Sequence, residues 1–269
     1  MIDKEKLKKR FSDQAKMYDA FAQVQKEMAK RLLSKIGEGH RIHTILEVGC
    51  GTGYLTQLLM DRFPEAHITG LDIAEGMINQ ARESFAGNSR LKLVCADVEA
   101  FETDEQYDLI ISNAAFQWLN NPGDTVNRLC SYLTLRGQLV FSTFGERTFH
   151  ELKESHEQAV AELNIDHNHI GIQFNNTSAW QAWCKEAGME ARLDEEELIE
   201  YFPSSREFLH SVKKIGANSS RGSNGAGPGL MRRLLELYDK HYKSDKGIPA
   251  TYEAIYAVCV PVKKVCILT

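Results

Sequence analysis

Between residues 43 and 144 the sequence alternates continuous apolar runs with segments of helical periodicity. The apolar runs are rich in Val, Ile and Leu, which is typical of strands in a parallel sheet that is covered on both faces. Strands that alternate with helices predict right-handed crossovers and a doubly wound α/β fold. We therefore expect strands at 43–49, 66–73, 91–97, 107–113 and 137–144, and helices at 54–63, 75–85 and 124–135.

The pattern changes after residue 145. Amphipathic stretches predict helices at 146–164, 178–188, 204–216 and 230–242, and the runs 189–202 and 251–262 indicate two late strands. These two strands bring the expected, mostly parallel sheet to seven strands. The acidic run in 189–202 is explained by a solvated strand face. The helical stretch at about 204–243 would be an insertion between the late strands, lying as a cap over one end of the sheet.

Bulk properties exclude several classes of protein. The 269 residues carry a net charge of -5, which argues against a general nucleic-acid binder. The 6 cysteines form no C-x-x-C pair, so we interpret them as reduced thiols of a cytoplasmic protein. We expect no membrane association, since no apolar run approaches membrane-spanning length. We also expect no metal, because the histidines in "DHNHI" at 166–170 lack further ligands.

A glycine-rich turn follows the first predicted strand, in the sequence "ILEVGCGTGYLT" at 45–56. Ligands of open α/β sheets bind at the carboxyl ends of strands. Gly49 and Gly51 match the start of the dinucleotide fingerprint G-x-G-x-x-G, but Tyr54 holds its third glycine position. The third glycine comes one residue early, at Gly53, and the Gly-Lys-Ser/Thr of a P-loop is absent. The turn therefore favours an amino-acid moiety over a phosphate group.

Polar side chains end the next three predicted strands. Asp72 ends the second strand, where a carboxylate can accept both ribose hydroxyls of a nucleoside in charge-assisted hydrogen bonds. Asp97 ends the third strand, where it could meet an adenine amino group, and Asn113 ends the fourth over the same pocket. NAD enzymes also use an acidic residue near the position of Asp72. Asp97 and the shifted glycine are what argue against NAD.

These segments together resemble class I S-adenosylmethionine (SAM)-dependent methyltransferases over residues 40–145. The resemblance implies SAM as the cofactor and S-adenosylhomocysteine as the product. It implies that Gly49, Gly51 and Gly53 pass close to the methionine part and that Asp72 holds the ribose. The other cofactor-binding residues that it implies are Ile73 and Met77 beside the adenine, Asp97 and Val98 at its edge, Asn113 on the floor, and also Tyr18, Glu47 and Gln117.

Segments outside this core extend the resemblance to nearly the full chain. The stretches "RFSDQAKMYDAFAQVQKEMA", "SNAAFQWLNN", "FSTFGERTFHEL", "FLHSVKKIGANSS" and "TYEAIYAV" together resemble the malonyl-[acyl-carrier protein] O-methyltransferases of biotin synthesis. The resemblance implies methylation of the free carboxyl of a malonyl thioester carried on acyl carrier protein. We expect one domain, 1–269, with an N-terminal helical lid at 1–40, a SAM-binding core at 41–145 and a substrate-side half at 146–269.

Two other interpretations stay open at this point. One is a methyltransferase that acts on malonyl-CoA, another small carboxylic acid or a quinone precursor. The other is a protein that binds SAM without catalysis.

The chemistry of a carboxyl acceptor sets what the site must contain. A carboxyl with a pKa of about 4 is ionised at neutral pH, so no general base is required. Proximity, alignment and removal of water matter instead, and positioning alone can supply roughly 7–11 kcal/mol. A cation should hold the carboxylate, and Arg147 is the first candidate, before Lys213, because a guanidinium matches a carboxylate in bidentate fashion. The resemblance implies that Tyr18 belongs to the lid over the cofactor, and Trp118, which follows Asn113 closely, could form a wall of the methyl-transfer site.

Acyl carrier protein is acidic, as the resemblance implies, so its docking surface should be basic. The candidates near the expected mouth of the site are Arg10 in the N-terminal segment and Lys213, Lys214, Arg232 and Arg233 on the cap.

Overall fold

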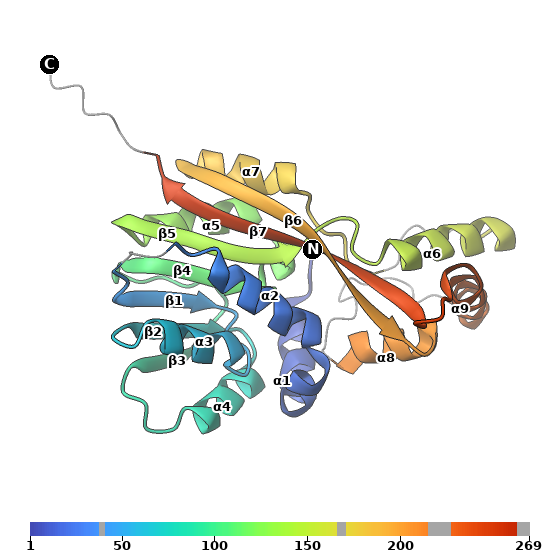
Figure 1. Ribbon diagram of the computed structural model, residues 1–269, viewed down its shortest axis with the longest axis horizontal. Coiled ribbons are helices and arrows are strands. Elements are labelled where there is room, and N and C mark those ends of the chain that lie inside the picture. Colours follow the sequence, from blue (N-terminus) through green and yellow to red (C-terminus); the bar gives the residue numbers. More distant parts are fainter. Residues whose placement is uncertain (38–40, 166–170, 215–226, 263–269) are drawn as a thin grey trace, which may run out of the picture.

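The computed structural model describes residues 1–37, 41–165, 171–214 and 227–262. Its centre is a seven-stranded sheet with the strand order β3-β2-β1-β4-β5-β7-β6. Helices cover both faces of this sheet (Figure 1). The histidine-containing segment 166–170 and the expected helix end at Gly216 lie outside the described residues.

The sheet is mostly parallel, as predicted. Its strands are β1 (Thr44–Val48), β2 (His67–Asp72), β3 (Leu91–Cys95), β4 (Tyr107–Asn113), β5 (Leu133–Phe144), β6 (Met189–Phe202) and β7 (Ile248–Pro261). β7 runs antiparallel to both of its neighbours, while β1 to β5 run parallel. The strand order reverses beside β1, between β1 and β4. The carboxyl ends of these two strands therefore form the crevice in which doubly wound folds bind ligands.

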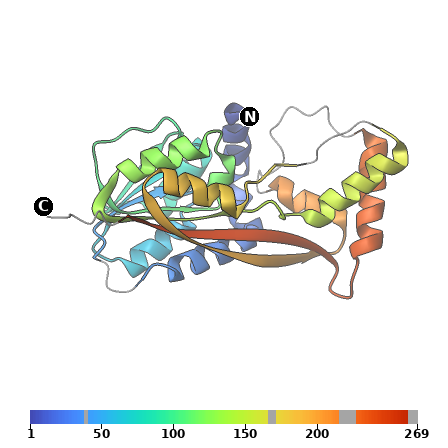
Figure 2. The same ribbon diagram turned by 90° about the horizontal axis from the view of Figure 1, so that it is seen from above.

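Two layers of helices cover the sheet, and further helices form the N-terminal segment and the cap. They are α1 (Lys4–Phe21), α2 (Gln23–Ser34), α3 (Tyr54–Arg62), α4 (Glu75–Ser84), the 3-10 turn η1 (Phe116–Trp118), α5 (Pro122–Ser131), α6 (His150–Leu163), α7 (Thr177–Glu186), α8 (Ser205–Lys214) and α9 (Pro228–Tyr242). Figure 2 shows α5 and α7 on one side of the sheet and α2 and α3 on the other. None of the helices in the described ranges combines the length and the apolar character that crossing a membrane requires.

The central strands bury both of their faces. Ile45 packs into the core beneath α2 and α3, whereas its neighbour Leu46 packs into the core beneath α5 and α7. In β4, Ile110 points to one core and Ile111 to the other. Successive side chains of a strand point to opposite faces. Continuous apolar runs rather than alternating ones are the result, which is why the sequence predicted these strands well.

The prediction of a helix through residue 135 is wrong. α5 ends at Ser131, and the chain from Leu133 onward belongs to β5. The hydroxyl of Thr134 donates a hydrogen bond to Asp108 on the neighbouring strand, at 3.1 Å. Pairing with β4, a partner distant in sequence, therefore overrides the local helical periodicity here.

A solvated strand face does not fully explain the acidic run of β6. Asp194 accepts a hydrogen bond from Lys35 just beyond α2, at 2.9 Å between Nζ and Oδ2. Glu196, two residues on and on the same face, forms an ion pair with Arg31 of α2. These charges tie the helix to the edge strand, so part of the run is structural.

The N-terminal helix α1 packs against α4 at a glycine. The N–H of Gly76 donates to Ser12 Oγ at 3.1 Å. A Cβ atom on Gly76 would lie 2.5 Å from the backbone oxygen of Ser12, closer than real Cβ contacts allow. Only glycine permits this approach of the two helices.

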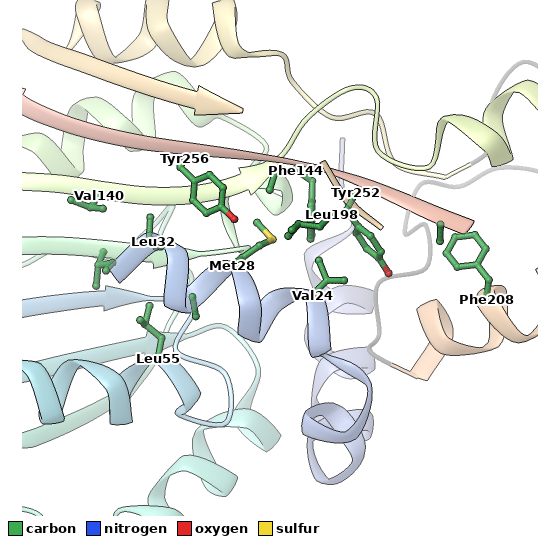
Figure 3. Packing of buried hydrophobic residues seen from close by; sticks show 14 of the residues in the cluster. Val24, Met28, Leu32, Leu55, Val140, Phe144, Leu198, Phe208, Tyr252 and Tyr256 are labelled. Atoms are coloured by element: carbon green, nitrogen blue, oxygen red, sulfur yellow. The ribbon is translucent and has the colours of Figure 1, made fainter. Parts of the chain in front are cut away.

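The late strands carry a helical cap, as predicted. α8 and α9 lie in the chain between β6 and β7. Figure 2 shows β6 and β7 extending beyond the rest of the sheet to reach these helices, with α6 beside α9. The cap thus includes α6, which the sequence had not assigned to it. Figure 3 shows one apolar cluster running from Val24 and Met28 of α2 to Tyr252 of β7 and Phe208 of α8.

We predict that Gly76→Val separates α1 from α4. The added side chain must displace backbone atoms of Ser12, and overpacking of this kind costs typically 1–3 kcal/mol. Faster proteolytic cleavage within residues 1–21 and a lower unfolding midpoint in urea should be observed. Gly229→Ala on α9 is the control, since a Cβ there meets nothing within 4 Å. Unchanged proteolysis of Gly76→Val would contradict the close approach.

Candidate active site

The turn after β1 is shaped by three glycines with positive φ. Gly49 and Gly51 have φ values of 73° and 56°, and both line the pocket at the carboxyl ends of β1 and β4. A Cβ on Gly49 would lie 2.5 Å from that of Ala115, so the loop after β4 can close onto this turn only at a glycine. Gly53, with φ 99°, instead begins α3 and packs against the ring of Phe85. Gly53 thus shapes the turn and is not among the residues that line the pocket.

Asp72 lies at the end of β2 and lines the same pocket. Its carboxylate accepts hydrogen bonds from the N–H groups of Gly51 at 2.9 Å and Ala74 at 2.8 Å. Burial raises the pKa of Asp72 to about 6, and these N–H donors oppose the rise. The carboxylate is therefore held in place by backbone donors, and a carboxylate has further lone pairs for a ligand.

Glu47 lies deeper, on β1, with only 1% of its surface exposed. Thr56 donates a hydrogen bond to it at 2.6 Å. Burial, with a smaller contribution from the nearby Asp72 charge, raises the pKa of Glu47 to about 8, although the hydrogen bond from Thr56 opposes the rise. Glu47 lines a small cavity that adjoins the main pocket and shares Gly49, Gly51 and Asn113 with it.

The far end of the pocket holds the predicted adenine-binding residues. Ile73, Met77, Asp97 and Val98 all line it, so the structure brings these residues together. Lys4 of α1 also lines it and lies 3.4 Å from Asp97 and 2.6 Å from Glu99, measured from Nζ to carboxylate oxygens. The sequence does not indicate that Lys4 belongs to this pocket, because nothing local shows that α1 reaches the segment after β3.

Asn113 lines the first pocket as predicted, whereas Gln117 does not. Asn113 lines the pocket floor, donates from Nδ2 to the carbonyl of Gln25 at 2.9 Å, and accepts from Ser142 at 2.7 Å. Gln117 is held by Ala114 O at 2.6 Å and by the Thr143 hydroxyl at 3.2 Å. Gln117 lines a second cavity beneath the cap instead of the first pocket.

This second cavity, which we call the cap cavity, has a volume of about 300 Å³. Its walls come from α1, α2, the segment after β4, and the cap helices. The lining side chains are mainly apolar and include Phe11, Trp118, Phe144, Phe149, Leu152, Ile172, Phe174, Phe208, Leu209, Val212, Met231 and Tyr252. Among the described residues that line it, the cations are Lys153 and Lys213.

The first pocket and the cap cavity meet at one wall. Four residues line both, namely Phe11, Tyr18, Ala114 and Trp118. The ring of Phe11 lies edge-on to Trp118, with 5.5 Å between centroids, and 6.4 Å from the ring of Tyr18. Burial raises the pKa of Tyr18, so its hydroxyl keeps its proton at neutral pH. The predicted placement of Tyr18 and Trp118 at the site fits this wall, which we call the shared wall.

The backbone is strained at Ala114, one of the residues of the shared wall. Ala114 has φ 50°, a left-handed conformation that a non-glycine residue adopts at a cost of about 1–3 kcal/mol. Its N–H donates to Ser142 O at 3.0 Å, and its carbonyl accepts from Gln117. These hydrogen bonds hold the bend that turns the chain from β4 across the pocket mouth into η1.

Arg147, the cation expected to hold a substrate carboxylate, has a structural role in the described residues. Its Nε lies 2.8 Å from Glu253 Oε1, its backbone N–H donates to Glu253 Oε2, and its Nη2 lies 3.6 Å from Glu197. Arg147 is absent from the lining of both the first pocket and the cap cavity. Two glutamates already neutralise its charge, so the sequence-based choice of Arg147 has no geometric support. Of the two preferred cations, the structure keeps Lys213.

The cap arginines are also paired. Arg232 approaches Glu236, at 4.0 Å, and Arg233 contacts Glu162 at 2.6 Å. Lys213 lies at the end of α8, exposed, at the rim of the cap cavity. Within the described ranges, no three His, Cys, Asp or Glu side chains lie together in a way that could hold a metal ion.

Comparison with known proteins places this architecture in a class. A family model described as "Methyltransferase domain" matches residues 45–137. The YcgJ protein from Bacillus subtilis shares the fold with a TM-score of 0.62 at 14% identity, covering 88% of this chain and 100% of that one. A putative methyltransferase from Bacillus halodurans gives 0.61 at 18% identity, with coverages of 88% and 100%. Fold and site together define a Rossmann-like methyltransferase.

Closer relatives narrow the class to a family. The malonyl-[acyl-carrier protein] O-methyltransferase of Anoxybacillus flavithermus is 46% identical over 258 residues, which are 95% of this chain and 97% of that protein. The protein of the same name from Acetivibrio thermocellus is 44% identical, with coverages of 95% and 93%. The chain belongs to the malonyl-[acyl-carrier protein] O-methyltransferase family.

We predict that the buried Glu47 makes the free protein less stable as pH rises. The pKa of Glu47 is about 8 in the folded protein, and the ordinary value of 4.5 applies to the unfolded chain. Between these two pH values the folded state therefore binds more protons than the unfolded state. The free energy of unfolding should therefore fall as pH rises from about 4.5 to 8. Glu47→Gln keeps an acceptor for Thr56 and should flatten this fall by an amount on the order of a few kcal/mol.

Urea unfolding of both forms at pH 5 to 9 measures this. Glu65→Gln, at an exposed carboxyl, is the control and should keep the wild-type slope. Parallel slopes for Glu47→Gln and wild type would show that Glu47 is ionised throughout.

Proposed function

We propose that the protein uses SAM to methylate the free carboxyl of a malonyl group carried on acyl carrier protein. The observation that carries this proposal is the shared wall, whose four residues line both a pocket that suits a nucleoside cofactor and an apolar cavity. Family membership supports the same activity, since the relatives bear this name. An acceptor in the cap cavity would face the cofactor across Tyr18 and Trp118.

The residues of the first pocket suit SAM. Asp72 is fixed by backbone donors and would accept the ribose hydroxyls, while Ile73 and Met77 would lie beside the adenine. Glu47 would receive the positively charged methionine end, because it is a buried carboxyl in the adjoining cavity. When bound, SAM supplies a methyl group on a positively charged sulfur, and transfer to a carboxylate oxygen leaves two neutral products without moving a proton.

The protein's own contribution is positioning and exclusion of water. Leu7, Phe11 and Tyr18 of α1 line the pocket, so α1 would act as a lid on it. An apolar wall strips water from the acceptor carboxylate and raises its reactivity, since electrostatic interactions strengthen when water is excluded. Positioning the acceptor and excluding water from it need no general base. This agrees with a Tyr18 hydroxyl that stays protonated.

For the carrier protein we favour the outer face of α8. Arg206, His210 and Lys213 are exposed and follow at intervals of four and three residues, so they share one helix face. The opposite face carries Phe208, which lines the cap cavity. An acidic carrier docked on this face would lie directly over the cavity that its acyl group must enter. Lys214 and Arg10 remain possible neighbours, while Arg232 and Arg233 already face glutamates.

We expect one added methyl group, seen by mass spectrometry, when malonyl-acyl carrier protein is incubated with the enzyme and SAM. Asp72→Ala should bind SAM more than tenfold weaker in calorimetry, since a charge-assisted partner is lost. Asp61→Ala, at an exposed carboxylate, is its control. Equal turnover of malonyl-CoA or a free diacid would remove the carrier from the proposal. SAM binding without transfer to any acid would leave a non-catalytic SAM-binding protein.

We predict that Arg206→Glu weakens recognition of the carrier. Kd for malonyl-acyl carrier protein should rise several-fold at low salt and converge with wild type at high salt, because exposed charges are screened. Turnover of malonyl-pantetheine, which lacks the acidic carrier, should stay unchanged. Arg232→Glu on α9 is the matched control, since Arg232 is equally exposed but lies off this face. Equal loss in both variants would contradict docking on α8.

A further inference from the structure

Lys153 is a cation that sequence reasoning passed over. It lies on α6, is half-buried, and lines the cap cavity between Phe149 and Phe174. Its Nζ donates to the carbonyl oxygen of Glu146 and lies 5.8 Å from the ring centroid of Phe174. The ammonium group is thus attached to an apolar cavity wall.

Lys153 differs from Lys4 and Arg147 in having no carboxylate partner among the described residues, a property that it shares with the exposed Lys213. Lys4 pairs with Asp97 and Glu99, and Arg147 pairs with Glu253. In the part of the chain that the structure describes, no carboxylate lies within ion-pair distance of Lys153 Nζ. A partly desolvated ammonium has a free-energy cost that a counter-ion would offset.

The electrostatic surroundings agree with this geometry. Burial lowers the pKa of Lys153, and the carboxylates of Glu146, Glu253 and Glu157 act at longer range to favour its charge. The direct contacts of the side chain leave room for an anion. An ammonium has three donors, and the structure shows one of them used.

A series of contacts connects Lys153 with the shared wall. Phe174, beneath its ammonium, lies 6.0 Å from Phe144 between ring centroids. The residue before Phe144, Thr143, donates a hydrogen bond to Gln117, which directly precedes Trp118. Lys153 and Trp118 thus line the same cavity and are linked through these side chains.

Lys213, the other cation of the cavity, suits a different task. It is exposed at the last turn of α8, whereas Lys153 lies half-buried on the cavity wall. Solvent weakens an ion pair with an exposed lysine, whereas a partly desolvated ammonium that is left without a counter-ion carries a larger cost. Lys213 thus fits the incoming carrier or its phosphate-bearing arm, and Lys153 fits the acyl terminus.

We propose that Lys153 anchors the carboxylate of the acyl substrate in the cap cavity and thereby distinguishes the acid from its methyl ester. This inference rests on the proposed function and assigns the anchoring role that the sequence had given to Arg147. Methylation converts the anionic carboxylate into a neutral ester, which removes the counter-ion of Lys153. The same side chain therefore favours binding of the substrate and release of the product.

Binding measurements test the inference without turnover. Malonyl-pantetheine and its methyl ester are titrated into the protein by calorimetry in the absence of SAM. Wild type should bind the acid at least tenfold tighter than the ester. Lys153→Met, which keeps the length of the side chain but removes the charge, should bind both equally, through loss of affinity for the acid alone. Lys153→Arg should restore much of the preference.

Retained binding of the ester shows that the cavity of Lys153→Met is intact, so misfolding does not mimic the result. SAM affinity should be unchanged, and Lys185→Met, at an exposed lysine of α7, should behave as wild type. A preserved preference for the acid in Lys153→Met would overturn the inference. Absence of methyl transfer from wild type to malonyl-acyl carrier protein would instead overturn the proposed function, so the two failures are distinguishable.

Discussion

Burial of the parallel strands on both faces is the constraint from which the site follows. Backbone groups of β1 and β4 are paired inside the sheet, and their side chains fill two apolar cores. The bends of the chain, where backbone groups leave the sheet pairing, therefore lie at the strand ends. The strand order reverses between these strands, so their carboxyl ends leave a crevice. Gly49, Asp72 and Asn113 all occupy this edge because no other part of the sheet could accept them.

The cap turns a cofactor-binding fold into a two-chamber site. β6 and β7 are each 14 residues long and extend past the parallel strands, carrying α8 and α9 between them. Aromatic side chains of β7 and the cap helices pack with aliphatic side chains and Met28 of α2 into one core, as Figure 3 shows. The cap is thus bound to the sheet by the same burial that forms the fold. Its inward face encloses the cap cavity, and its outer face is free to carry charges for a partner.

Some cations near the site are paired with carboxylates and have a structural role, whereas a cation without such a partner is available to bind a substrate anion. Arg147 is fixed to Glu253, a nearly buried carboxylate that would be costly to leave alone. Lys4 serves the far end of the cofactor pocket in the same way. Lys153 shares the cavity with aromatic rings and a backbone carbonyl instead. A substrate anion would therefore act as the counter-ion of Lys153, whereas a neutral product would not.

The sequence by itself determined the sheet and several of the residues that line the pocket at its edge. Strands at 107–113 and 189–202 stand as predicted, and Asp72, Asp97 and Asn113 line the expected pocket. Periodicity and turn residues are local properties, and the ends of parallel strands necessarily meet at one edge. Whole-chain resemblance added the family, and the relatives confirm it.

Only the tertiary structure decided what each charged or flexible element contacts. It moved the boundary between α5 and β5, made Gly53 a packing residue against Phe85, and paired Arg147 with Glu253. Each of these outcomes depends on a partner that lies far away in the sequence. A long side chain such as Lys153 or Arg147 can reach several neighbours, and burial and ion-pair energies choose among them only after the chain has folded.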